Sequence, residues 1–296
     1  MPKKLLQPLP LYLYLAVVSL IILYPIFLMV KISASHQADI MKPHKDLLWG
    51  PAGITLEHWH NVFTSGLLLP SLFKSLLVAT MVMLLAILIA APAAYVIARL
   101  GSPLKYLCII ALFLSRTFPE VAIALPVSVV FLHWNLLDTS FGLILAHLIK
   151  VLPYVGWILI GTFEAIPLSL EEASSVDGAS KIRTLRKVIV PLSLPGVAVA
   201  AMLVWLESWN EFTYALYLTV SENTLPLQTY YYLNRGGIFN SAAYATIITL
   251  PVIVLTFILQ RYITSGMLAG GGEVTEGHAH GTGDLAAGQK SLCKRL

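Results

Sequence analysis

Charged residues are scarce in this chain. Asp, Glu, Lys and Arg make up 11% of its 296 residues, whereas soluble domains carry about 25%. Apolar residues make up 57%, and the mean hydropathy is +0.80. This shortage of charge excludes a single soluble core and predicts an integral membrane protein. The apolar runs are long and continuous rather than alternating, so we expect helices and not a closed barrel.

Cysteines and recognisable catalytic motifs are also rare or lacking. The chain has two cysteines, Cys108 and Cys293, which indicate neither a disulfide nor a zinc signature with the scattered histidines, so no metal site is expected. No lipidation motif and no G-x-x-x-x-G-K-[ST] phosphate loop is present in the sequence. No catalytic triad or acid pair is suggested. The chain is therefore not expected to hydrolyse ATP or to be an enzyme.

Six apolar runs are long enough to cross a membrane as helices, which takes about 20 residues. They are residues 11–32, 72–98, 104–132, 141–163, 192–218 and 242–263. The expected fold class is an all-α membrane protein with six transmembrane helices. The first run also resembles a signal peptide, but it exceeds the roughly 7–15 apolar residues of a signal sequence. We therefore expect a retained span.

Lys and Arg residues are distributed unevenly among the expected loops and termini. One side holds Lys3, Lys4, Arg99, Lys105, Lys181, Arg183, Arg186, Lys187, Arg261, Lys290, Lys294 and Arg295, and the other holds Lys31, Lys42, Lys45, Lys74 and Arg235. Because cytoplasmic loops are enriched in basic residues, both termini are expected inside. The predicted organisation is a cytoplasmic N-terminus (1–10), a six-helix domain (11–265) and a flexible cytoplasmic tail (266–296).

A polar segment, residues 167–191, separates the fourth and fifth runs on the expected cytoplasmic side. Ser169 followed by Glu172 has the spacing of a capping box, which predicts a helix start. Gly178 can adopt the left-handed conformation that ends a helix. The first half of the segment therefore predicts a short acidic helix followed by a turn.

A second short helix is expected between Ser180, whose side chain can cap it, and Pro191, which would end it where the next span begins. Its basic residues are Lys181, Arg183, Arg186 and Lys187. Basic residues alone would fit binding to anionic lipid, but lipid binding leaves the acidic pair Glu171-Glu172 unexplained. We therefore expect the helix pair to face a soluble partner.

Charged residues also occur inside the expected spans, where each costs about 2.5–3.5 kcal/mol on insertion scales. Arg116 and Glu120, four residues apart, are predicted to share one helical face. A polar substrate path would comprise Arg116, Glu120, Lys150, Glu207, Trp209, Asn210 and Glu211. The alternative is structural pairing, of Arg116 with Glu120 and of Lys150 with Glu207 or Glu211. Tyr230, Tyr231 and Tyr232 fit either contact with an external protein or an interfacial aromatic belt.

The polar segment resembles the "EAA" loop of binding-protein-dependent ABC importer permeases. That pattern is Glu-Ala-Ala, three residues, Gly, nine residues, Ile, one residue and Leu-Pro; Glu172-Ala173-Ser174, Gly178 and Val188-Ile189-Val190-Pro191 keep its spacing. The sequences Asp177-Gly178-Ala179, Trp209-Asn210-Glu211-Phe212 and Arg261-Tyr262-Ile263-Thr264-Ser265-Gly266 are similar to the sugar-importer branch. The resemblance covers nearly all of residues 10–272 and points to the maltose-type second-permease subunits.

The resemblance implies a type I ABC importer permease fold in a bacterial inner membrane. Its coupling residues would be Glu171, Glu172, Ala173, Asp177, Gly178 and Pro191, with Glu172 making the main polar contact to an ATPase and Gly178 supplying the turn. The implied partners are a second homologous permease, two ATPase subunits that use ATP and Mg²⁺, an extracytoplasmic solute-binding protein, a carbohydrate and the lipid bilayer. No cofactor is expected on this chain.

Two other classes are compatible with parts of the sequence. An ion-driven secondary transporter would use Glu207, Glu211 and Lys150 as proton groups, but such carriers often have more spans and inverted repeats. An intramembrane enzyme would need a nucleophile or metal set that is not recognisable here. Within ABC importers, Arg116 and Lys150 would also suit an anionic oligosaccharide or a sugar phosphate.

Overall fold

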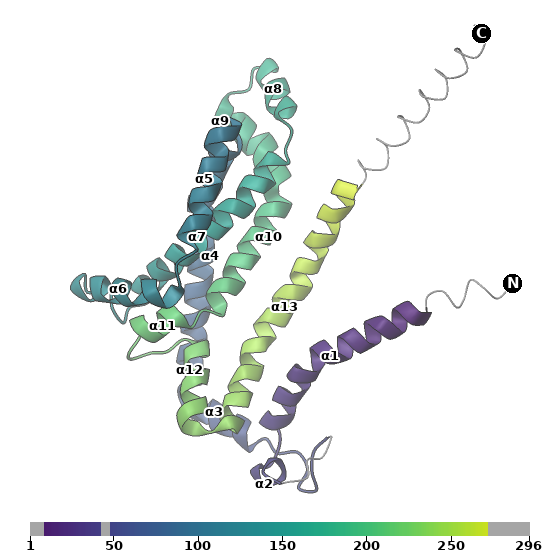
Figure 1. Cartoon of the computed structure of the whole chain (residues 1–296), viewed down its shortest axis with the longest axis vertical. Helices are drawn as coiled ribbons and strands as arrows, with labels where there is room; N and C mark the ends of the chain where they lie inside the picture. Colours follow the sequence, from purple (N-terminus) through teal and green to yellow (C-terminus); the bar gives the residue numbers. More distant parts are fainter. Residues whose placement is uncertain (1–8, 43–47, 272–296) are drawn as a thin grey trace, which may run out of the picture. The chain divides into compact units, whose positions relative to one another are not determined.

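The structure is a computed structural model that describes the backbone of residues 9–42 and 48–271 (Figure 1). The helices are α1 (Leu9–Ser33), α2 (Gln37–Ile40), α3 (Glu57–Thr64), α4 (Leu68–Ala98), α5 (Ser102–Ser115), α6 (Glu120–His133), α7 (Ser140–Glu164), α8 (Leu168–Val176), α9 (Lys181–Thr184), α10 (Val190–Trp209), α11 (Thr213–Leu218), α12 (Leu225–Tyr231) and α13 (Ile238–Gly271). Two π-helical turns, η1 (Leu185–Ile189) and η2 (Tyr232–Gly236), complete the elements. The all-α class is confirmed for these residues, which contain no β-strand.

Long apolar helices confirm the membrane character of the chain. Within the described residues, five segments are long and apolar enough to span a bilayer: Pro10–Ser33, Leu68–Ala98, Ser140–Glu164, Lys181–Trp209 and Ile238–Ile258. Helices α5 and α6 add a sixth span if they are counted together. Most of the tail expected from residue 266 lies outside the described residues, as does Cys293, whereas Cys108 is a free cysteine.

The third expected span, 104–132, is interrupted. Helix α5 ends at Ser115 and α6 begins at Glu120, with Pro119 as its N-cap. Proline disfavours the helical conformation of the residue before it and lacks the N–H that would continue the hydrogen-bond ladder. The prediction that Arg116 and Glu120 share one helical face is therefore wrong, because they lie on opposite sides of this break.

The fifth expected span, 192–218, is interrupted as well. Helix α10 ends at Trp209, and α11 begins at Thr213. The Glu211 carboxylate accepts hydrogen bonds from the backbone N–H groups of Tyr214 (2.8 Å) and Ala215 (3.2 Å). These are donors that a helix start leaves unsatisfied. Glu211 therefore stabilises a new helix start inside the apolar run.

The chain divides into two compact units. Unit 1 lies within residues 1–82, 117–150 and 205–253, and unit 2 lies within 83–116, 151–204 and 254–296. In unit 1 the largest fully buried side chains include Trp209, Tyr214, Leu218 and Tyr244, and in unit 2 they include Leu159, Ile160 and Ile189. Each unit thus has its own apolar core.

A turn after α6 holds the loop that follows α11 within unit 1. Asp138 has a positive φ of 59°, and its backbone N–H donates to the Leu218 carbonyl (2.8 Å). Its carboxylate accepts hydrogen bonds from the N–H groups of Val220 (2.8 Å) and Ser221 (3.1 Å). Burial acts to raise the pKa of Asp138, but these hydrogen bonds to the charged form outweigh burial and hold the pKa below its ordinary value of 3.8.

This lowered pKa predicts an acid-sensitive loop. A carboxyl group whose pKa is lower in the folded state stabilises the fold fully above its unfolded pKa, and this stabilisation is lost as the pH falls through the folded pKa. We expect hydrogen exchange at Val220 and Ser221, corrected for intrinsic rates, to lose protection below about pH 4. In Asp138→Ala protection should be low at every pH. Equal protection of the variant and the wild type at pH 7 would contradict this prediction.

Candidate functional site

The polar segment 167–191 begins with helix α8, which starts earlier than predicted. Its N-cap is Pro167, and no side chain caps it by a hydrogen bond. Ser169 therefore lies inside the helix, and the predicted capping box with Glu172 is wrong. The fixed φ of proline suits it to a helix start, and this places the start ahead of Ser169.

The turn after α8 is as predicted. Gly178 has a φ of +77°, and its N–H donates to the Ser175 carbonyl (3.0 Å). A Cβ added at Gly178 would have no atom within 4 Å, so a side chain there would cost only the conformational strain, about 1 kcal/mol. Ser180 is the N-cap of α9, although its side chain makes no capping hydrogen bond. The hydroxyls of Ser174 and Thr184 lie 2.9 Å apart and join the two short helices.

The prediction that Pro191 ends the second helix is wrong. Helix α9, the π-turn η1 and α10 follow one another without a break, and Pro191 is in the first turn of α10. Proline cannot donate the backbone hydrogen bond that an α-helix needs at this position. The wider π-helical bonding, in which the Val190 N–H donates to the Leu185 carbonyl, occupies the turn just before it.

Two adjacent acidic residues of α8 have different environments. The Glu171 carboxylate is bound by Arg99, with Nε at 2.8 Å and Nη2 at 2.7 Å, and by the Tyr95 hydroxyl at 2.8 Å. Glu172 is exposed. Of the two glutamates in the predicted coupling set, Glu172 presents its side chain outward, whereas Glu171 is directed into unit 2.

Arg99 joins three parts of unit 2. Besides Glu171, its guanidinium donates hydrogen bonds to the backbone carbonyls of Phe163 (3.0 Å) and Ile166 (3.1 Å), at and beyond the end of α7. Arg99 itself follows the last residue of α4. Sequence reasoning used Arg99 only to assign topology and did not identify Tyr95. Their spacing of four residues, one helical turn apart, was the available signal.

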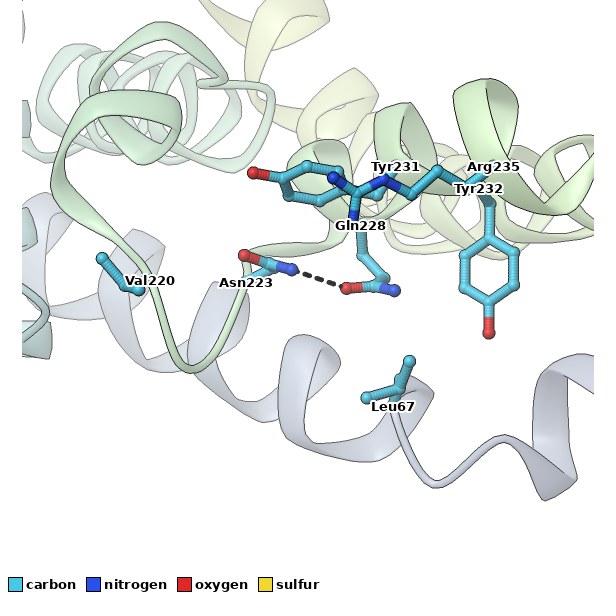
Figure 2. Close-up of a pocket in the computed structure, with 7 residues that line it drawn as sticks. All are labelled: Leu67, Val220, Asn223, Gln228, Tyr231, Tyr232 and Arg235. Carbon is cyan, nitrogen blue, oxygen red and sulfur yellow. Dashed lines mark hydrogen bonds between the residues drawn. The ribbon is translucent and has the colours of Figure 1, made fainter.

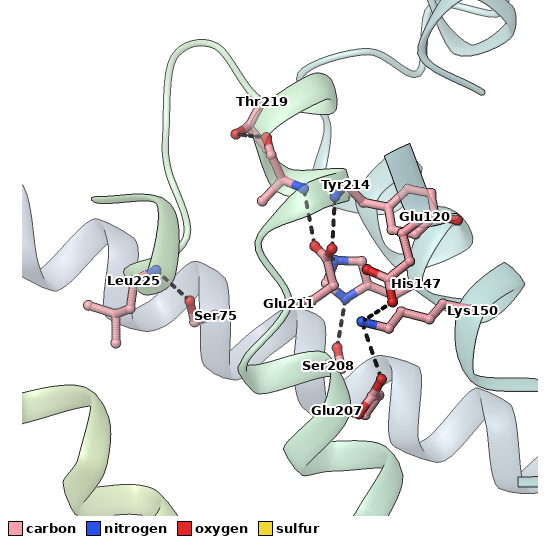
Figure 3. Close-up of polar contacts among 11 residues, drawn as sticks. Ser75, Glu120, His147, Lys150, Glu207, Ser208, Glu211, Tyr214, Thr219 and Leu225 are labelled. Carbon is pink, nitrogen blue, oxygen red and sulfur yellow. Dashed lines mark hydrogen bonds and ion pairs between the residues drawn. The ribbon is translucent and has the colours of Figure 1, made fainter. Parts of the chain in front are cut away.

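A polar cluster in unit 1 contains three of the predicted path residues, Glu120, Lys150 and Glu207 (Figure 3). Lys150 Nζ lies 3.0 Å from a Glu120 oxygen and 3.2 Å from a Glu207 oxygen. The predicted pairing of Lys150 with Glu207 is thus present, and Glu120 is a second partner. The Glu120 and Glu207 side chains are 42% and 35% exposed, whereas Lys150 is 12% exposed. The two carboxylates therefore hold the lysine and still face outward.

Glu211 belongs to a separate, buried network. His147 Nε2 lies 3.2 Å from a Glu211 oxygen, and His147 Nδ1 lies 2.8 Å from the Ser208 hydroxyl. Both side chains of the His147–Glu211 pair are at most 1% exposed. Because Glu211 also accepts from the start of α11, its role here is structural. Sequence reasoning missed His147 and Ser208; His147 lies three residues before Lys150, on the same face of the run.

The other predicted path residues do not join one cluster. Trp209 is buried, stacks on Trp205 with 4.8 Å between centroids, and donates to the Ile248 carbonyl (3.2 Å). Asn210 is exposed. Arg116 belongs to unit 2, where its guanidinium lies 5.2 Å from the centre of the Tyr154 ring. In the described part of the chain no group of three or more His, Cys, Asp or Glu residues is placed to hold a metal ion.

The chain belongs to the family described as "Binding-protein-dependent transport system inner membrane component", which matches residues 83–268. It is 34% identical over 226 residues to the trehalose transport system permease protein SugB of Mycobacterium tuberculosis, covering 74% of this chain and 82% of the relative. It is 34% identical over 233 residues to the sulfoquinovosyl glycerol transport system permease protein SmoH of Agrobacterium fabrum, covering 77% and 81%. A solved bacterial ABC transporter that imports the acidic polysaccharide alginate has the same fold (TM-score 0.68, 22% identity, 88% of this chain and 98% of that chain).

These comparisons establish the class of the protein. It is a multi-pass inner-membrane permease subunit of an ABC importer that works with a binding protein, and its fold is that of ABC importer permeases. The ion-driven carrier considered from the sequence is not favoured.

Proposed function

We propose that this permease carries a sugar or oligosaccharide inward, driven by ATP hydrolysis in separate subunits. The substrate class is supported by two relatives that cover most of the chain and whose names specify trehalose and a sulfonated sugar glyceride. ATP and Mg²⁺ would be used by two ATPase subunits, because the sequence has no phosphate-binding loop. A second homologous permease and an extracytoplasmic solute-binding protein would complete the assembly, and this subunit would have no catalytic residue.

The arrangement of the acidic pair in α8 is the observation that supports ATP-driven coupling best. Glu171 is tied by Arg99 and Tyr95 to the end of α4, whereas Glu172 on the same helix is exposed. A partner that binds Glu172 would therefore pull on a helix that is anchored to a membrane span. Ala173, Asp177, Gly178 and Pro191 would complete the coupling surface and the turn behind it.

Glu120, Lys150 and Glu207 are the members of the predicted path that suit contact with a polar substrate. Their charges are paired, which offsets part of the cost of holding them within an apolar segment, and the two carboxylates are partly exposed. Asn210 is also exposed. Trp209 and Glu211 would support this surface from the core rather than touch the substrate, since both are buried.

Reconstitution tests this function. The complete complex in proteoliposomes should take up radiolabelled trehalose only with ATP and the binding protein, and uptake should be unaffected when a proton gradient is collapsed. Uptake that follows a proton gradient without ATP would show that the proposed energy source is wrong. Failure to take up any sugar in a broader panel would reject the substrate class.

Removal of the Glu172 carboxylate should uncouple the complex. We expect Glu172→Ala to reduce ATP-driven uptake by at least tenfold and to weaken retention of the ATPase during affinity purification, because an exposed acidic contact to the partner is lost. The fold should persist, since Glu172 is exposed. The matched control is Glu222→Ala, which removes the same charge from an exposed position after α11. If both variants transport and assemble like the wild type, Glu172 is not a coupling residue.

A further inference from the structure

Unit 1 contains a cavity of about 440 Å³ beside helix α12 (Figure 2). It is lined by Leu67, Val220, Asn223, Gln228, Tyr231, Tyr232 and Arg235. Ligand cavities in proteins typically measure about 300–1,000 Å³, so this one is large enough for a small molecule. By the charge distribution of the loops, the segment that contains most of its lining is expected on the extracytoplasmic side.

One helix face supplies most of the polar lining. Gln228, Tyr231, Tyr232 and Arg235 follow the spacing i, i+3, i+4 and i+7, which places them on a single face. The helix changes there from α12 to the π-turn η2, which carries Tyr232 and Arg235. Single π-turns are frequent at functional sites. The sequence contained this spacing, but it was not recognised among the three consecutive tyrosines.

Neighbouring groups hold the lining side chains in place. The Asn223 amide donates a hydrogen bond to Gln228 Oε1 (2.9 Å), and the Arg235 guanidinium lies 5.3 Å from the centre of the Tyr231 ring. Tyr232 stacks on the buried Tyr244, with 4.7 Å between ring centroids. A preorganised site loses less free energy to side-chain ordering on binding. Gln228 and Tyr232 are therefore held in place, and the exposed Arg235 lies against the Tyr231 ring.

The chemistry of the lining matches a sugar ring better than an apolar ligand. Each amide has two N–H donors and a carbonyl acceptor, and the Asn223–Gln228 bond uses one donor and one acceptor. The planar guanidinium supplies further paired donors, while the tyrosine rings supply aromatic faces. Sugar rings carry adjacent hydroxyls that both donate and accept, and C–H faces that pack on aromatic rings. Among the described residues that line the cavity, Arg235 is the charged one and none is acidic.

We propose that this cavity binds a sugar unit of the transported carbohydrate on the extracytoplasmic side of the permease. Tyr231 contacts the ring, and Asn223, Gln228 and Arg235 bind hydroxyl groups. Because Arg235 gives the described lining a positive charge, an acidic sugar binds more tightly than a neutral sugar of the same size. This inference rests on the proposed function, since it assigns a subsite to the substrate class proposed there.

The test measures sugar binding to the intact complex of permeases and ATPases in nanodiscs, without nucleotide and without the binding protein. The probes are trehalose and digalacturonate, with affinity measured by saturation-transfer difference NMR titration. The wild type should bind both saturably and digalacturonate more tightly. Arg235→Ala should weaken digalacturonate binding at least fivefold, and Tyr231→Leu should weaken both sugars at least threefold. Asn234→Ala is the matched control, because Asn234 is an exposed neighbour outside the lining. This variant should bind both sugars as tightly as the wild type.

Binding of neither sugar by the wild type, or equal binding by all variants, overturns the inference. If the Arg235 and Tyr231 variants lose stimulation of ATPase activity by the binding protein but bind sugars normally, the cavity holds a protein side chain and the inference is also wrong. Uptake by the wild-type complex in proteoliposomes distinguishes failure of the proposed sugar site from failure of the proposed function. If the wild-type complex takes up sugar with ATP but the variants bind sugar as the wild type does, only the proposed sugar site in the cavity is rejected. If the wild-type complex takes up no sugar with ATP, the proposed function itself is rejected.

Discussion

Replacing Glu211 by alanine should lower the free energy of unfolding by about 2–6 kcal/mol, because two buried backbone N–H groups would lose their acceptor at about 1–3 kcal/mol each. The carboxylate lies 3.2 Å from His147 Nε2 and accepts hydrogen bonds from two backbone N–H groups at the start of α11. Its removal would leave these buried groups without their acceptor. The measurement is denaturant-induced unfolding of the purified complex, followed by fluorescence.

Glu207→Ala is the matched control, one helical turn before Glu211. The Glu207 side chain is 35% exposed, and partly exposed ion pairs contribute at most about 1 kcal/mol. The free energy of unfolding of Glu211→Gln should lie between those of the two alanine variants, because an amide oxygen still accepts a backbone hydrogen bond but carries no charge. If Glu207→Ala and Glu211→Ala destabilise the protein equally, the proposal that the buried Glu211 carboxylate has a structural role is wrong.

Arg99→Ala should greatly reduce transport while leaving the membrane spans folded. It removes the charged partner of Glu171 and the hydrogen bonds to the carbonyls of Phe163 and Ile166. Helix α8 would then lose its anchor to the end of α4, so that force applied at Glu172 would no longer reach the span. We expect at least a tenfold loss of ATP-driven uptake and a loss of about 2–3 kcal/mol in unfolding free energy, given about 1.5–3 kcal/mol per charged hydrogen bond.

A double-mutant cycle separates anchoring from a general loss of stability. If Arg99 acts through Glu171, Arg99→Ala and Glu171→Ala should be non-additive by more than about 0.5 kcal/mol, and the uptake of the double variant should resemble that of either single variant. Arg99→Lys should restore uptake only in part, because lysine supplies a point charge instead of the guanidinium fork. Additive effects would show that the two residues act independently.

Features that depend on composition and local spacing could be predicted from the sequence. The shortage of charge and the long apolar runs were sufficient to predict the all-α membrane class. The spacing around Gly178 was sufficient to predict the turn with positive φ. The interruption after Arg116 was harder to predict. Pro119 is visible in the sequence, but many transmembrane helices tolerate proline. The interruption at 210–212 was missed, since it depends on Glu211 accepting from N–H groups that become available only once the helix has ended.

The sequence by itself determined the class, the approximate spans, the polar segment and the family. Only the tertiary structure decided which side chains work together: it directs Glu171 inward and leaves Glu172 exposed, pairs Lys150 with Glu120 as well as Glu207, and places His147 against Glu211. Membrane partition and helix turns respond to residues within a few positions of one another. The partner of a charge is set by contacts between helices distant in the chain, and two adjacent glutamates with the same chemistry differ only in what the fold places beside them.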